Sequence, residues 1–174
     1  MAVLPIITAP DPRLKVKCEP VAQVDSAIAR LMDDMLDTMY LAPGIGLAAP
    51  QVGVTKRILV IDVSPKEGPR EPIRMANPEI VWRSEALAIY EEGCLSLPEQ
   101  YADVERPEKV RVRYLDEKGA AQEREAEGLM ATCIQHEIDH LDGVIFVDHL
   151  SALKRKMILR KLTKQKKLEA LAGD

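Results

Sequence analysis

Aromatic residues are scarce in this sequence, making up only 3% of its 174 positions. A core built from this chain must therefore be aliphatic. Hydrophobic residues still reach 47%, which excludes a disordered chain and is enough for one domain with a substantial core. No apolar run approaches the roughly 20 residues of a membrane-spanning helix, so we expect no membrane partner.

Cysteines are also few. Cys18, Cys94 and Cys133 are odd in number and far apart, which argues against a disulfide framework. The N-terminal stretch lacks a basic segment and is interrupted by Pro5, which makes it a poor signal peptide. We therefore expect a cytoplasmic protein, in which a thiolate can serve as a metal ligand.

The net charge of -4 is unevenly distributed along the chain. Residues 151–174 hold 8 Lys/Arg and 2 acidic residues, a balance of +6. Residues 1–150 hold 16 Lys/Arg and 26 acidic residues, a balance of -10, and the two parts sum to -4. With no repeat or linker in the sequence, we predict a single domain over 1–150 that carries 151–174 as a basic, helical and not independent tail.

Helical periodicity marks the early part of the chain. Apolar residues recur at helical spacing over 25–40, and Asp25 is placed to act as the N-cap. Two prolines predict an extended, turn-rich segment over 10–14. Residues 43–53 are predicted to form a glycine-rich loop in which backbone can approach another group closely.

β-Branched and alternating apolar residues predict strands through the middle of the chain. A helix is expected over 127–141, followed by a short strand over 144–147 and a basic helix from 151 to about 168. Grouped strands with helices early and late, and no regular βαβ alternation, favour an α+β fold. The predicted strands cover 58–63, 73–83, 86–90, 110–115 and 120–126.

A His-Glu-x-x-His pattern lies on the helix predicted over 127–141. His136 and His140 are four residues apart, so they lie on one helix face, roughly 6 Å apart along the axis. Two imidazoles in this arrangement can bind one metal ion. Glu137, next to the first histidine, can reach a metal-bound water instead of the metal.

A catalytic metal site needs a third protein ligand. Cys133 would lie roughly 7.5 Å along the helix axis from the level of the metal, so it is expected to be a small core residue. A zinc-peptidase signature would continue to a histidine where this chain has Phe146. Cys94 remains either the third ligand or an inert buried thiol. Beside it, Gly93 would permit unusual backbone angles, and Pro98 is expected to end the segment.

The glycine-rich loop formally matches a dinucleotide-binding fingerprint at Gly44, Gly46 and Ala49. The context excludes that function, because a helix precedes the loop where a strand is required and Pro50 prevents a helix from following. Gln51 ends the loop as a polar side chain in an apolar stretch. From the residues alone, it is either a functional amide or one that only satisfies backbone groups.

Three blocks of this sequence occur together and in order. They are Gly-Ile-Gly-Leu-Ala-Ala-Pro-Gln at 44–51, Glu-Gly-Cys-Leu-Ser-Leu-Pro at 92–98 and Gln-His-Glu-Ile-Asp-His-Leu at 135–141. Together they resemble the bacterial type of peptide deformylase. The resemblance implies an α+β fold with mostly antiparallel sheets packed around a central metal-bearing helix, and a C-terminal helix. It implies metal ligation by Cys94, His136 and His140.

The same resemblance implies a metal-dependent hydrolase that removes the formyl group from N-formyl-Met nascent peptides and releases formate. Glu137 would be general base and acid, and Gln51 and the Leu95 N–H would stabilise the oxyanion. One divalent ion is implied per chain, typically Fe(II), with zinc, nickel or cobalt able to replace it. Walls of the substrate cleft are expected from Ile45, Gly46 and Gly93.

Three questions stay open at this point. A small His-Glu-x-x-His zinc peptidase and a metal-stabilised binding module are the alternative functions. The role of Tyr101 is undecided, because some relatives carry arginine there. The basic helix over 151–168 either contacts ribosomal RNA, as the resemblance suggests, or is simply solvated; no contact with DNA is expected.

Overall fold

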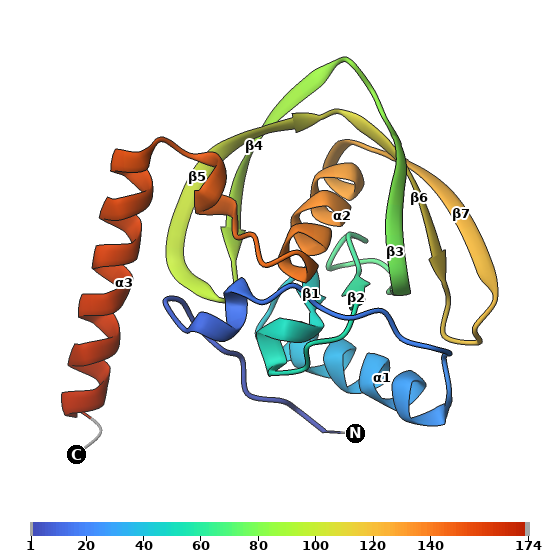
Figure 1. Ribbon diagram of the computed structural model, residues 1–174, viewed down its shortest axis with the longest axis horizontal. Coiled ribbons are helices and arrows are strands. Elements are labelled where there is room, and N and C mark those ends of the chain that lie inside the picture. The colour runs from blue at the N-terminus through green and yellow to red at the C-terminus, as the bar shows by residue number, and fades with distance from the viewer. Residues whose placement is uncertain (1, 173–174) are drawn as a thin grey trace.

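Residues 2–172 are described by a computed structural model, shown as a ribbon in Figure 1. Residue 1 of the predicted domain over 1–150 and residues 173–174 of the predicted tail over 151–174 lie outside this range. The described chain forms two antiparallel sheets and three α-helices, so the predicted α+β fold is confirmed. Within these residues, no helix combines the length and the apolar character needed to cross a membrane.

The larger sheet has five strands in the order β1-β2-β3-β6-β7, all paired antiparallel. The second sheet is a hairpin of β4 and β5. The strands are β1 (Gly46–Ala48), β2 (Ile58–Ile61), β3 (Ile73–Arg83), β4 (Leu87–Cys94), β5 (Leu97–Pro107), β6 (Lys109–Leu115) and β7 (Ala121–Glu127).

Two helices cover opposite faces of the larger sheet. Strand β2 shows this arrangement, because its side chains alternate between the faces. Leu59 and Ile61 belong to one buried cluster with residues of α2 (Gly128–Leu141). Ile58 and Val60 belong to a second cluster with residues of α1 (Ser26–Leu41). The continuous apolar run of β2 therefore follows from burial on both sides.

Helix α1 begins where the sequence predicts. The Asp25 side chain accepts a hydrogen bond from the Ile28 N–H at 2.9 Å, which satisfies one amide of the first turn. Met32, Met35 and Met39 are fully buried against the sheet. Flexible methionine side chains thus take much of the core volume that aromatic residues fill in other proteins.

Helix α2 occupies the middle of the molecule. It contacts β1, β2, β4, β5, β6 and β7, and Figure 1 shows the strands curving around it. Ten of its side chains are buried, including both histidines and Glu137. The predicted histidine-bearing helix therefore lies inside the fold, sheltered from solvent.

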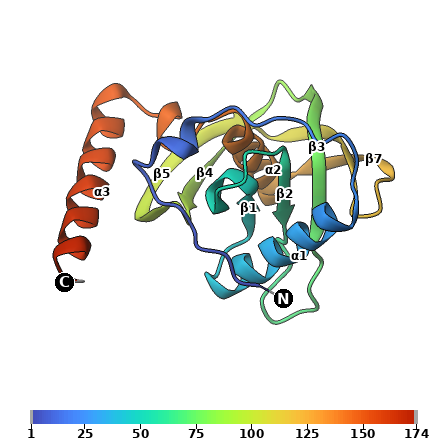
Figure 2. The same cartoon turned by 60° about the horizontal axis from the view of Figure 1, so that its bottom comes forward.

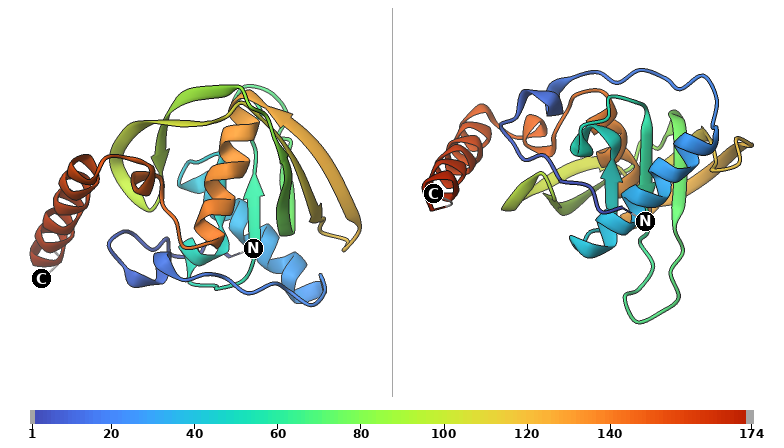
Figure 3. Two further views of the ribbon diagram at one scale, coloured as in Figure 1. Left: turned by 45° about the horizontal axis from the view of Figure 1, so that its top comes forward. Right: turned by 90° about the horizontal axis from the view of Figure 1, so that it is seen from below.

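The last helix, α3 (Ala152–Ala172), lies along one side of the body, as Figure 2 and both views of Figure 3 show. Leu162 is buried, and Ile158 and Leu159 pack against the same cluster, which includes Phe146. The Lys166 ammonium donates to the Thr8 carbonyl at 2.7 Å. Most of the other side chains of α3 are exposed.

Several predicted elements differ from the structure. The strand predicted over 144–147 is wrong, because Phe146–His149 forms a 3-10 helix, η3. The segment over 43–53 contains strand β1 and a 3-10 helix, η2 (Ala49–Val52), not only a loop. The turn-rich opening contains a further 3-10 helix, η1 (Pro12–Lys15), which tolerates Pro12 because its first position needs no N–H donor.

Strand β5 was not predicted, and Pro98 lies within it instead of ending the segment. The β4–β5 pairing extends from Leu87 opposite Pro107 to Cys94 opposite Leu97, with a register shift between Gly93 and Cys94. Leu95 and Ser96 form the turn of this hairpin. The hairpin therefore presents its turn, with Cys94 at the end of β4, to the middle of the molecule.

Candidate metal centre

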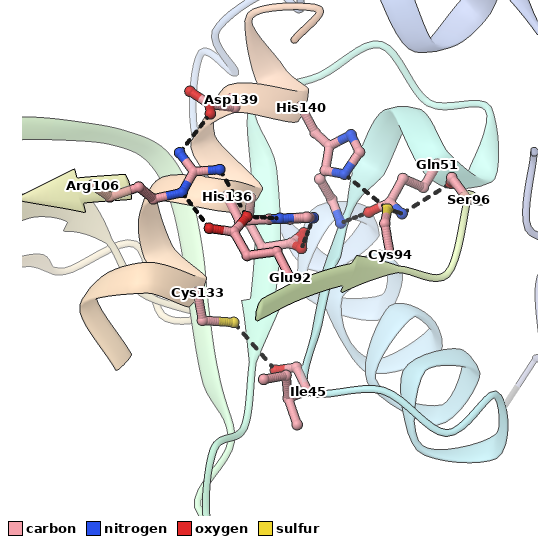
Figure 4. Close-up of polar contacts among 12 residues, drawn as sticks. Ile45, Gln51, Glu92, Cys94, Ser96, Arg106, Cys133, His136, Asp139 and His140 are labelled. Atoms are coloured by element: carbon pink, nitrogen blue, oxygen red, sulfur yellow. Dashed lines mark hydrogen bonds and ion pairs between the residues drawn. The ribbon is translucent and has the colours of Figure 1, made fainter. Parts of the chain in front are cut away.

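Three metal-binding side chains meet beside α2. One donor atom each from Cys94, His136 and His140 lies within 4.8 Å of the others. The Cys94 sulfur is 3.3 Å from Nε2 of His140 (Figure 4). The helix supplies the two imidazoles one turn apart, and the β4–β5 hairpin brings the thiol from more than 40 positions away. The structure thus brings the three predicted ligands together.

The donor set fits a divalent metal. One thiolate and two imidazoles are the ligands that zinc and other late transition ions accept, and a three-residue set leaves a coordination position open. Within residues 2–172, no fourth His, Cys, Asp or Glu belongs to this cluster. A buried oxygen of Glu137, Oε2, has no hydrogen-bond partner in the described chain, as expected for an atom that faces a bound water.

Both histidines are buried, and the pKa values of both are strongly shifted. Burial, and then the neighbouring His136, hold the pKa of His140 well below its usual value. Burial also opposes a charge on His136, but Cys94 and Glu92 outweigh it and raise the pKa of His136 well above the usual range. A cationic centre is therefore favoured here, and a bound metal can take the place of the proton.

A carboxylate orients His136 from behind. Glu92 Oε1 lies 2.9 Å from Nδ1 of His136, on the side of the ring away from the cluster (Figure 4). Arg106 donates to the same carboxylate through Nε at 2.7 Å and Nη2 at 2.9 Å, and through Nη1 to Asp139 at 2.8 Å. Burial opposes ionisation of Glu92, but the hydrogen bonds from Arg106 and His136 keep its pKa below the usual value. Such a partner fixes the ring orientation of a ligating histidine.

Sequence reasoning missed this supporting network. Glu92 lies two residues before Cys94 on the same strand, and that spacing places both on one face. This spacing could have indicated that Glu92 belongs to the site, since an acidic residue on a buried strand face needs a buried partner. Arg106 and Asp139 gave no comparable signal, because their meeting depends on how β5 packs against α2.

Gln51 points its amide at the cluster. Its Oε1 accepts from the Ala48 N–H at 2.9 Å, which leaves Nε2 directed at Ser96 Oγ, 2.9 Å away, and at the Cys94 sulfur, 3.5 Å away. Gln51 is 1% exposed, so this amide is held rigidly. Ser96 is a further member of the site that the sequence did not reveal.

A cavity of about 840 Å³ opens onto the metal centre. Leu95, together with the three predicted wall residues Ile45, Gly46 and Gly93, lines it. Cys133 also borders the cavity, but its sulfur lies near the Ile45 carbonyl, at 3.8 Å, and outside the ligand cluster. The position of Cys133 outside the cluster agrees with the prediction from its distance along the helix axis from the level of the metal.

The surroundings of Gly93 differ from the expectation. A Cβ atom at this position would lie 2.5 Å from Cε1 and 2.7 Å from Cδ1 of Tyr101, directly opposite on β5. No unusual backbone angle is recorded for Gly93. A side chain at position 93 would therefore have to displace the Tyr101 ring, which is 65% exposed and also borders the cavity.

Comparison with known proteins agrees with this geometry. A sequence profile of the family described as polypeptide deformylase matches residues 3–156. The chain belongs to the polypeptide deformylase family. Among curated relatives, the peptide deformylase of Methylocella silvestris is 58% identical over 173 residues, covering 98% of this chain and 88% of its own length. That of Alkalilimnicola ehrlichii is 60% identical over 164 residues, covering 94% and 91%.

Solved deformylase structures share the fold over nearly the whole chain. The crystal structure of peptide deformylase from Ehrlichia chaffeensis matches with a TM-score of 0.92 and 41% identity, covering 97% of this chain and 99% of that one. A structure of the enzyme from the same organism in complex with actinonin matches with a TM-score of 0.90 and 44% identity, covering 95% and 98%.

Membership of the deformylase family also decides between the alternatives left open by the sequence. In the zinc-peptidase signature, position 146 would supply a third histidine; here Phe146 is buried and its ring stacks on His136, with centroids 6.2 Å apart. His149, three residues further along the chain, lies 2.8 Å from Asp139 and outside the ligand cluster. A structural, closed metal site would need a fourth ligand, which the cluster lacks within residues 2–172.

Proposed function

We propose that this protein is a metal-dependent hydrolase that removes the N-terminal formyl group from formyl-methionine of newly made polypeptides and releases formate. The observation that carries the proposal is the meeting of Cys94, His136 and His140 beside a cavity of about 840 Å³, in a chain of the deformylase family. We further propose that the reaction takes place in the cytoplasm, where formyl-Met chains are made.

Cys94, His136 and His140 would hold one divalent cation. When bound, the cation supplies a Lewis acid that can lower the pKa of a coordinated water far below its bulk value, to about 7. We propose Fe(II) as the native ion, as the family resemblance implies, with zinc, nickel or cobalt as possible substitutes. Glu92 and Arg106 would keep His136 in its ligating orientation, because they fix the opposite nitrogen of its ring.

Glu137 is proposed as the general base and acid. Its position next to His136, and a partnerless oxygen among the described residues, support this role. Burial raises the pKa of Glu137 to about 7, and positive charge bound nearby would lower it again. The carboxylate can thus take a proton from the attacking water and pass it to the departing amine.

The oxyanion formed by this attack needs hydrogen-bond donors. Gln51 Nε2 is held toward the cluster by the bond from Ala48 to its oxygen, and this orientation supports its proposed role. Leu95 borders the cavity directly after Cys94, where its N–H is proposed as a second donor. Loss of one such donor typically lowers kcat by about 10²- to 10³-fold.

The test is formate release from formyl-Met-Ala compared with acetate release from acetyl-Met-Ala, using protein purified without oxygen and analysed for metal. We expect formate release only, with close to one metal ion per chain. Glu137→Gln should keep the metal and lose about 10²- to 10⁴-fold in rate, because the amide cannot accept the proton. Glu125→Gln on the exposed face of β7 is the control. Formate release by Glu137→Gln at the wild-type rate would contradict the proposed role.

The basic helix α3 is proposed to contact ribosomal RNA, which would place the enzyme beside emerging chains. Support comes from the charge of +6 over 151–174 and from the exposure of most of its Lys and Arg side chains. The packing of Leu162 into the body supports the proposal that this tail and residues 1–150 form one domain.

A further inference from the structure

One wall of the cavity is a short exposed segment that joins α1 to β1. Residues 42–46 all border the cavity. Within this segment, the Ile45 side chain is 42% exposed, and the close packing is confined to Gly44 beside Leu95 and Gly46 beside Cys133. Polar contacts at its ends help to keep such a segment in one conformation, because ordering backbone is entropically unfavourable.

Both ends of this segment are held by one residue, Asp62. Before the segment, the Tyr40 hydroxyl donates to Oδ2 of Asp62 at 2.6 Å. At its far end, the backbone N–H of Asp62 donates to the Ile45 carbonyl at 2.8 Å. The side chain of Asp62 thus holds the start of the wall and its backbone holds the end.

Asp62 is itself firmly placed. It follows β2, whose pairing with β1 ends with Ile61 opposite Gly46 and continues through the Asp62–Ile45 bond. Its carboxylate is 5% exposed and also accepts hydrogen bonds from Ser64 and from the Glu71 N–H at 3.1 Å. A buried carboxylate with this many donors has one well-defined position.

The position of the Tyr40 side chain is also fixed by its contacts. The Arg70 guanidinium lies over the face of its ring, 3.9 Å from the ring centre. Burial and the hydrogen bond to Asp62 raise the pKa of Tyr40 to about 12, so its hydroxyl remains a donor at every pH at which the protein would be assayed. Neither Tyr40 nor Asp62 borders the cavity.

We propose that Asp62 and Tyr40 are positioning residues, which hold the wall formed by residues 42–46 and thereby set the affinity for the formyl peptide. The inference rests on the proposed deformylase function. A wall that is free to open lowers the fraction of molecules competent to bind, and the apparent affinity falls by that fraction. The chemical step is unaffected, because both side chains lie away from the reacting atoms.

Tyr40→Phe is the variant that tests this inference, since it removes one hydroxyl and keeps the ring beneath Arg70. Tyr114→Phe is the matched control: Tyr114 is 9% exposed, and no side-chain hydrogen bond of its hydroxyl is recorded in the described chain. We expect Tyr40→Phe to raise KM for formyl-Met-Ala by up to roughly tenfold, because loss of one hydrogen bond to a charged group shifts the equilibrium between held and open wall by about that factor. We expect kcat and metal content to stay within about twofold, and the control to match the wild type.

Amide hydrogen exchange supplies a readout independent of activity. In Tyr40→Phe, the peptide over 41–47 should exchange faster than in the wild type, while peptides from α2 should not change. Asp62→Asn retains the backbone bond to Ile45 and should shift KM in the same direction. The double variant should add little, because the two side chains share one bond.

Unchanged KM in both variants, or a fall in kcat with unchanged KM, would overturn the inference. Faster exchange over 41–47 without a change in KM would overturn it as well, because the wall would then not control binding. A wild-type protein that releases no formate would refute the proposed function instead, and the exchange comparison would still decide whether the pair holds the wall.

Discussion

Two cysteines lie close to the histidines of α2, but within residues 2–172 only Cys94 has its sulfur in the ligand cluster. Cys133 comes from the same helix as the histidines, and its position on that helix keeps its sulfur beside Ile45. Burial raises the pKa of Cys133 well above the usual value, so its thiol stays protonated and is a poor ligand.

This difference gives a prediction at the scale of one residue. Cys94→Ala should lose most of the bound metal and, with it, formate release, because two imidazoles alone hold a divalent ion weakly. Cys133→Ala removes a more deeply buried thiol from the same region and should keep about one metal ion per chain. Metal analysis of both variants, purified in parallel, provides the measurement. Equal metal content in the two variants would contradict the assignment of Cys94.

At the scale of the elements, Arg106 joins three of them. Its guanidinium on β5 binds Glu92 of β4 and Asp139 of α2, and its side chain is only 6% exposed. The hairpin that carries Cys94 and the helix that carries both histidines are therefore joined by ion pairs behind the cluster.

We expect Arg106→Met to destabilise the fold by about 3–5 kcal/mol, because the buried Glu92 carboxylate loses both hydrogen bonds from Arg106 and keeps only His136 as a partner. Urea unfolding of the metal-free protein measures the effect. Arg111→Met is the control, since Arg111 is a half-exposed partner of Glu125 on the sheet surface and should cost less than about 1 kcal/mol. Similar losses in the two variants would show that the buried network contributes no more than a surface pair.

Asp62, the residue that follows β2, gives a prediction about the pH dependence of stability. Burial opposes ionisation of Asp62, yet hydrogen bonds from Ser64, Tyr40 and Glu71 hold its pKa below the usual value. A folded-state pKa below the unfolded value, about 3.9, means that the ionised carboxylate stabilises the fold above that pH. That stabilisation is lost as pH falls through the folded-state pKa.

Asp62→Asn should therefore be less stable than the wild type at pH 7, and the difference should shrink as pH falls below about 4. Urea unfolding of both proteins at several pH values measures this difference, with Asp37→Asn on the surface of α1 as the control. A difference that stays constant down to pH 3 would contradict a stabilising role for the ionised carboxylate.

At the scale of the whole molecule, the basic helix lies beside an acidic body and is fastened to it. Leu162 enters the core, Arg155 pairs with Asp148 at 3.1 Å, and Lys166 binds the Thr8 carbonyl. Deleting the helix would therefore remove core contacts along with charge. Neutralising exposed cations tests the proposed ribosome contact more cleanly.

The variant carries glutamine at four exposed positions of α3, and we expect it to bind ribosomes at least about tenfold more weakly at low salt, because phosphate contacts dominate such binding. Turnover of formyl-Met-Ala should be unchanged. Removing four exposed cations from the body is the matched control. Pelleting with ribosomes is the measurement, and equal pelleting of both variants would refute a specific contact by α3. The substitutions are at Lys154, Lys161, Lys164 and Lys167 in the variant, and at Lys56, Arg83, Lys118 and Arg124 in the control.

The sequence by itself determined the features that depend on neighbours along the chain. The period of apolar residues and the Asp25 cap placed α1 to within one residue, and the spacing of His136 and His140 predicted two imidazoles on one helix face. These features are local, because helical hydrogen bonds and side-chain faces are set within one or two turns. Short apolar stretches carried less information, and the segment over 144–147 was assigned wrongly for that reason.

Only the tertiary structure decided which distant groups meet. Residue chemistry alone left Cys94 as either a ligand or an inert thiol, and the turn at Leu95 and Ser96 placed its sulfur beside His140. The contacts of Arg106, and the hold of Asp62 on the cavity wall, likewise join segments that are far apart in sequence. Such pairings depend on the packing of both sheets around α2, because no short-range pattern encodes the partner of a buried charge.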